Sequence, residues 1–201
     1  VGIGIGTWDA AMFHLLTHAF FKCLLFLCAG AVIHEMAHLK VHHKLDFDPQ
    51  DLRNMGGLRQ YMPQTFILMT VASLALAGFP LTSGYLSKDS IIISAFEWAA
   101  AKGPIFQIVP TILIIVSIMT AFYIGRLIFK AFFSELRIKN LLGSSVHLND
   151  SPKLMLWPMY FLGICCFFPL FSINPISYHD AWVMDGLLVQ YPYETNHTAH
   201  L

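Results

Sequence analysis

The chain has 201 residues, of which 56% are hydrophobic and only 12% are charged, and its mean hydropathy is +0.61. This composition indicates a membrane protein rather than a soluble domain. Twelve basic residues balance twelve acidic ones, so net charge gives no case for a nucleic acid or another polyanion as a partner. Charge-free runs cover 63–87, 103–125 and 154–178, and each reaches the roughly 20 residues that a helix needs to cross a bilayer core. We therefore expect an all-α, polytopic bundle of transmembrane helices.

The first apolar segment, 10–33, predicts a membrane-crossing helix that begins at a Thr7 or Asp9 cap. It carries His14, His18 and Lys22 at four-residue spacing, which places them on one stripe of the helix about 12 Å long. Ionisable groups inside a membrane are costly and usually pair, relay protons or bind ions. The plain alternative is that each is merely hydrogen-bonded between helices, but three on one stripe favour a path for protons.

The next apolar segment, 63–101, is expected to be interrupted, because Gly78, Pro80 and Gly84 break a regular helix. Helix breaks at membrane depth often mark ion sites, and Lys88 directly after this one is a candidate proton acceptor. The alternative for Lys88 is that it extends to the membrane interface.

The Lys and Arg residues cluster between the first and second segments and again after residue 125. The positive-inside rule then favours a single interrupted crossing over two short ones, with both basic regions on the cytoplasmic side or its matrix or stromal equivalent. After a turn at 102–104, further crossings are expected from about Ile105 to Phe133 and from about 153 to Phe171. This gives a membrane domain over 1–171 and an interfacial or partial next segment over 172–201.

A histidine-rich stretch lies between the first two segments, at 34–53. We leave open whether it is a contact surface, a helical extension or a disordered insert. Within it, His34, Glu35 and His38 match the His-Glu-x-x-His zinc pattern, and Asp185 with Gly186 is a conceivable third-ligand motif for an intramembrane metalloprotease. Short motifs arise by chance, so no metal is expected. The four cysteines, at positions 23, 28, 165 and 166, match no redox or metal motif.

Three motifs together resemble the antiporter-like subunit L, or chain 5, family of respiratory complex I. They are His-Leu-Leu-Thr-His-Ala-Phe-Phe-Lys-Cys-Leu-Leu-Phe-Leu at 14–27, Met-Gly-Gly-Leu-Arg at 55–59, and Ala-Leu-Ala-Gly-Phe-Pro at 75–80 followed by Ser-Lys-Asp at 87–89. The resemblance runs from about residue 8 to residue 135. After Asp150 only hydrophobic character matches. The chain opens without an initiating Met, and we interpret it as the later half of such a subunit.

This resemblance implies proton translocation coupled to electron transfer from NADH to quinone, with His14, His18, Lys22 and Lys88 at the family's proton-carrying positions. It implies membership of an enzyme complex, with no redox chemistry in this piece. NADH, flavin, iron–sulfur clusters and quinone would be bound elsewhere. Other membrane-arm subunits, lipid, protons and internal water are the expected partners, and the bacterial inner membrane is the expected location, with the mitochondrial inner membrane as the alternative. A multi-subunit sodium/proton antiporter is the nearest rival function, and a purely structural membrane scaffold is another.

Overall fold

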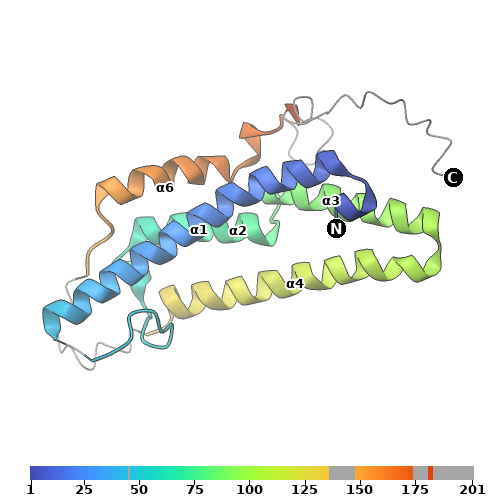
Figure 1. The fold of residues 1–201 in the computed structure, drawn as a ribbon. Coiled ribbons are helices and arrows are strands. Elements are labelled where there is room, and N and C mark those ends of the chain that lie inside the picture. The colour runs from blue at the N-terminus through green and yellow to red at the C-terminus, as the bar shows by residue number, and fades with distance from the viewer. Residues whose placement is uncertain (45, 136–147, 174–180, 183–201) are drawn as a thin grey trace.

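The computed structural model of the protein describes residues 1–44, 46–135, 148–173 and 181–182. These residues form an elongated bundle of helices (Figure 1). The elements in chain order are η1 (Ile3–Ile5), α1 (Trp8–His43), η2 (Leu58–Gln60), α2 (Pro63–Ala77), α3 (Ser83–Lys102), η3 (Pro104–Gln107), α4 (Ile108–Ile128), the π-helical η4 (Phe129–Phe133), α6 (Lys153–Cys165) and η5 (Phe168–Leu170). The expected all-α bundle is confirmed.

Helix α1 is continuous over 36 residues, which is roughly 54 Å. The predicted first crossing therefore extends through the histidine-rich stretch as far as His43, so the first part of that stretch is a helical extension. Thr7 occupies the N-cap position, but it makes no side-chain cap. Its hydroxyl instead donates to the carbonyl of Gly2, and Asp9 lies inside the first turn.

The predicted interruption of the second segment is confirmed. Helix α2 ends at Ala77, with Gly78 in the left-handed conformation as its C-cap, and α3 starts at Ser83 with Thr82 as a hydrogen-bonded N-cap. Gly84 does not lie in the break as predicted, since it belongs to the first turn of α3. The two halves follow one another in the same direction along the bundle (Figure 1), as expected for one interrupted crossing.

The described parts of the two basic regions lie at the same end of the bundle. The end of α1, the start of α2, the end of α4 and the start of α6 all meet there (Figure 1). The backbone N–H of Gln64 and the hydroxyl of Thr65 both donate to the Asp150 carboxylate, at 2.7 Å. These bonds join the first turn of α2 to the chain just before α6, which fixes the shared end.

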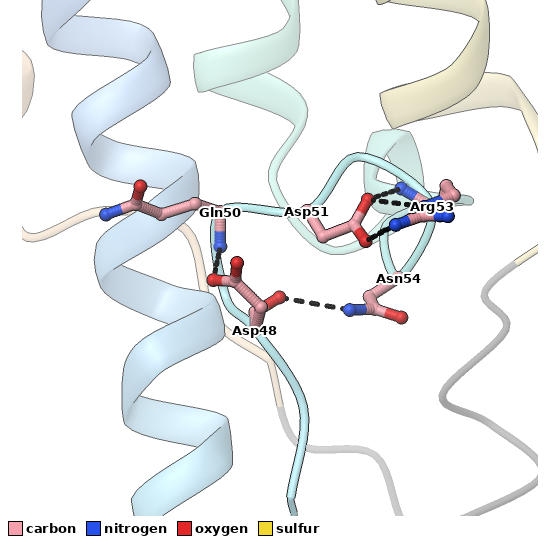
Figure 2. Close-up of polar contacts among 5 residues, drawn as sticks. All are labelled: Asp48, Gln50, Asp51, Arg53 and Asn54. Carbon is pink, nitrogen blue, oxygen red and sulfur yellow. Dashed lines mark hydrogen bonds and ion pairs between the residues drawn. The ribbon is translucent and has the colours of Figure 1, made fainter.

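The loop between α1 and α2 is held by short-range turns around two aspartates (Figure 2). Asp48 accepts from the backbone N–H of Gln50, and Asp51 accepts from the backbone N–H and the guanidinium of Arg53. The side-chain amide of Asn54 donates to the carbonyl of Asp48. The bonds from Arg53 hold the pKa of the Asp51 carboxyl below the ordinary value of 3.8. The second part of the 34–53 stretch is thus an ordered loop.

Helix α6 is shorter than the predicted last crossing. It has 13 residues and ends at Cys165, so at about 20 Å it does not span a bilayer core by itself, and the predicted end near Phe171 is wrong. The cause lies in the break between α2 and α3. The backbone N–H of Ser83 donates to the carbonyl of Cys166 at 2.9 Å, and Thr82 and Phe167 form an isolated antiparallel bridge.

The bundle core forms around α1. Phe21, Leu24 and Met36 on this helix are fully buried, and they belong to a cluster that includes residues of α2, α4 and α6. Helix α4 by contrast leaves large apolar side chains such as Ile118 and Phe122 mostly exposed. Within the described residues, α1 and the segment Pro104–Phe133 are long and apolar enough to cross a membrane.

Candidate functional site: a cavity between α1, α3 and α4

A cavity of about 400 Å³ lies between the helices that carry the predicted site residues. Its lining includes His14, His18 and Lys22 from α1 and Lys88 from α3. The structure therefore brings all four sequence-predicted side chains to one space. The volume is sufficient for several water molecules, since a buried water needs about 30 Å³.

The stripe on α1 faces this cavity, and its four-residue spacing places the three side chains on one side of the helix. The ring centroids of His14 and His18 are 5.6 Å apart, and the His18 ring lies edge-on to Phe21 at 5.2 Å. All three stripe residues are partly buried. Two imidazoles and an amine thus border one cavity.

Lys88 lies against the end of the preceding half-helix. Its ammonium Nζ donates to the carbonyl of Leu76 at 2.8 Å. In a continuous helix that carbonyl would accept from the backbone N–H of residue 80, but residue 80 is a proline and has none. Lys88 therefore supplies the missing donor, and its positive charge lies at the negative end of the α2 dipole. The Lys88 side chain also lies beside Gly78, where an added Cβ would be in ordinary contact with Cδ of Lys88, at 3.4 Å.

Sequence reasoning missed two groups of hydroxyls. Thr17 and Ser87 are fully buried. The Ser87 hydroxyl lies 3.0 Å from Nδ1 of His14 and accepts from Thr17 at 2.7 Å. On α4 the polar side chains that line the cavity are Ser117, Thr120 and Tyr123. Their three-residue spacing on an otherwise apolar helix was a signal in the sequence.

The His-Glu-x-x-His alternative lies elsewhere. His34 and His38 are exposed and Glu35 is partly buried on the part of α1 beyond the cavity, and among the described residues no group of three or more His, Cys, Asp or Glu side chains is placed to hold a metal. Asp185 and Gly186 lie outside the described residues, as does most of the predicted segment 172–201. The four cysteines are free thiols.

Comparison with known proteins identifies the family. Residues 1–114 match the model of the NADH:quinone oxidoreductase/Mrp antiporter transmembrane family. The chain is 42% identical over 175 residues to NADH-quinone oxidoreductase subunit L of Rhodobacter capsulatus, which covers 82% of this chain and 22% of that protein. It is 41% identical over 169 residues to NADH-ubiquinone oxidoreductase chain 5 of Phytophthora infestans, covering 84% and 23%.

A third relative differs in the electron donor that its name gives. F(420)H(2) dehydrogenase subunit L of Methanosarcina mazei is 39% identical over 176 residues, covering 82% of this chain and 23% of that protein. The chain thus spans between a fifth and a quarter of the length of these curated relatives.

The fold also has a solved counterpart. A chain in the structure of the Mrp complex from Dietzia sp. DQ12-45-1b matches with a TM-score of 0.62 and 20% identity, covering 81% of this chain and 34% of that one. The resemblance read from the three motifs is therefore confirmed, and the chain belongs to the NADH:quinone oxidoreductase/Mrp antiporter family of integral membrane proteins.

Proposed function

We propose that this chain forms part of a proton-translocating membrane subunit, with the cavity bordered by His14, His18, Lys22 and Lys88 as a section of the proton path. The observation that carries the proposal is the convergence of all four ionisable groups on one cavity. They come from two different helices, and Lys22 and Lys88 are 66 positions apart in the sequence. Ionisable side chains that face a shared cavity inside a membrane are typical of proton relays.

In this proposal the imidazoles and the amines have different tasks. The two ring nitrogens of an imidazole can each donate or accept a proton, so His14 and His18 pass protons to and from cavity water. The lysines hold protons, and two ammonium groups on one water-filled path repel each other, so loading one favours release from the other. A charge change in neighbouring subunits would alter their occupancy in turn.

We further propose that translocation is coupled to electron transfer from NADH to quinone, with the chain as part of a membrane-arm subunit of complex I. The names of relatives such as the Rhodobacter capsulatus subunit support this. NADH, flavin, iron–sulfur clusters and quinone would all be held by other subunits. The bacterial inner membrane is the proposed location, and the mitochondrial inner membrane is the alternative.

The test is proton transport by the assembled complex that contains the full-length subunit. Lys22→Ala and Lys88→Ala should each reduce transport roughly tenfold or more, because positioned proton-transfer groups contribute at least this much to rate. Assembly, measured by subunit content, should persist. Unchanged transport in both variants would refute the proposal.

Lys102→Ala is the matched control. Lys102 is an exposed lysine in the last turn of the same helix as Lys88, so its loss should leave transport unchanged. Since Lys88→Ala also removes the donor to Leu76, Lys88→Arg keeps a cation there. An arginine does not release its proton, so this variant should assemble normally and still transport poorly.

A multi-subunit sodium/proton antiporter is the second candidate function. The match to a chain of the Mrp complex favours it, and the cavity chemistry would be similar. The partner subunits distinguish the two. Co-purification with NADH dehydrogenase and quinone-module subunits supports complex I, whereas co-purification with small antiporter subunits supports the alternative.

A further inference from the structure

Two buried hydroxyls are linked by hydrogen bonds to Nδ1 of His14. Ser87 on α3 lies 3.0 Å from Nδ1 of His14, and Thr17 on α1 donates to Ser87 at 2.7 Å. Both hydroxyl residues are 0% exposed, whereas His14 lines the cavity. This arrangement leaves Nε2 as the ring nitrogen available to the cavity.

Each hydroxyl of this Thr17–Ser87 pair has one proton and a second acceptor within reach. The Ser87 hydroxyl lies 3.5 Å from the carbonyl of Gly84, and the Thr17 hydroxyl lies 3.2 Å from the carbonyls of Phe13 and His14. Since a hydroxyl donates once and accepts twice, the pair has two consistent arrangements. In one, Thr17 donates to Ser87 and Ser87 donates to Nδ1. In the other, Nδ1–H donates to Ser87 and Ser87 donates to Gly84.

We propose that Thr17 and Ser87 are positioning residues for His14, which hold its ring and its tautomer. This inference rests on the proposed function. When His14 is neutral, the second arrangement keeps its ring proton on Nδ1, which donates to Ser87, so the lone pair of Nε2 is free to accept a proton from the cavity side. When His14 is protonated, Nδ1–H keeps the same bond and the added proton is on Nε2. The proton therefore enters and leaves at Nε2 without any movement of the helices.

The decisive test compares two substitutions at Thr17 in the assembled complex. Thr17→Val keeps the side-chain shape and removes the hydroxyl, whereas Thr17→Ser keeps the hydroxyl and removes a methyl group. If the hydroxyl positions His14, Thr17→Val slows proton transport about threefold to tenfold, the loss of one hydrogen bond, and Thr17→Ser retains the wild-type rate. A packing role gives the opposite order, because the buried methyl is then what matters, and that order would overturn the inference.

Ser87→Ala provides a second measurement with its own control. It removes the direct partner of His14 and should slow transport by at least as much as Thr17→Val. Ser94→Ala removes another buried hydroxyl from α3 and should have no effect, because in the described part of the structure this hydroxyl donates to the carbonyl of Ser90 in its own helix. Equal rates for the Ser87 and Ser94 variants would also overturn the inference.

The lysine variants show whether a negative result contradicts the positioning inference or the proposed function itself. If Lys22→Ala and Lys88→Ala lose transport while Thr17→Val and Ser87→Ala retain it, the inference on positioning is wrong and the proposed function stands. If the lysine variants transport normally, the proposed function itself is wrong.

Discussion

Single residues decide how closely the two halves of the interrupted helix approach. Gly84, in the first turn of α3, packs directly on the carbonyl of Ala75 in the last turn of α2, and a Cβ there would lie 1.8 Å from that oxygen. No side chain fits this space, so glycine is required. A similar restriction at Gly78 comes from its φ of 79°, which L-residues rarely adopt.

Gly84→Ala should therefore destabilise the assembled subunit by about 3 kcal/mol, at the upper end of the usual cost of overpacking. The obstacle is backbone, which cannot move aside as a flexible side chain does. Thermal unfolding of the purified complex is the measurement. Gly30→Ala in α1, where nothing lies within 4 Å of an added Cβ, is the control and should be neutral or slightly stabilising. A Gly84 variant as stable as the Gly30 variant would contradict the predicted close approach.

At the scale of elements, the break between α2 and α3 and the early end of α6 supply hydrogen-bond partners for each other. A helix that stops inside a membrane leaves backbone N–H and C=O groups that need partners. The Ser83 N–H and hydroxyl bond the carbonyls of Cys165 and Cys166, and the Phe168 N–H reaches the carbonyl of Leu81 at 3.4 Å. The two irregular segments therefore form one hydrogen-bonded unit that holds α3 in place.

Ser83→Ala should loosen this unit, because one buried side-chain donor is lost, at a cost of about 1 kcal/mol. The expected result is faster labelling of Cys165 and Cys166 by a membrane-permeant maleimide, by about fivefold if labelling follows local opening. Both thiols are at most 2% exposed in the native fold. Peptide mass spectrometry distinguishes labelling of these two thiols from labelling of the exposed Cys23. As the control, Ser94→Ala should leave the labelling rate of Cys165 and Cys166 unchanged.

The whole molecule is organised by the direction of its helices. Because α2 and α3 run on in the same direction, the loop after α1 and the chain before α6 lie at one end of the bundle (Figure 1). The turn between α3 and α4 lies at the other end. Among the described residues, this arrangement places the basic side chains of both regions at one end, as the positive-inside rule requires.

Cysteine scanning in oriented membrane vesicles tests this topology, in a Cys23→Ser background that removes the exposed native thiol. Gln50→Cys and Asn149→Cys, both at exposed positions, should react with an impermeant maleimide from the same side. Lys102→Cys should react only from the opposite side. Labelling of the positions at 50 and 149 from opposite sides would show that the second segment crosses twice.

The sequence by itself determined the membrane class, the stripe of His14, His18 and Lys22, and the interruption after Ala77. These follow from composition, from helical spacing and from local backbone chemistry, which are all properties of neighbouring residues. The family membership was also readable, because its motifs are short and contiguous. The roles of the four ionisable residues in proton transport stay predictions that the transport measurements test.

Only the tertiary structure decided which side chains share a space. Helical spacing places residues on one face but does not say what packs against it. The junction of Lys88 with Leu76, the hydroxyls of Thr17 and Ser87 behind His14, and the end of α6 at the break all depend on contacts between distant segments. The last crossing was predicted too long for this reason, since an apolar run indicates where a helix can continue, whereas the partners of its backbone groups determine where it ends.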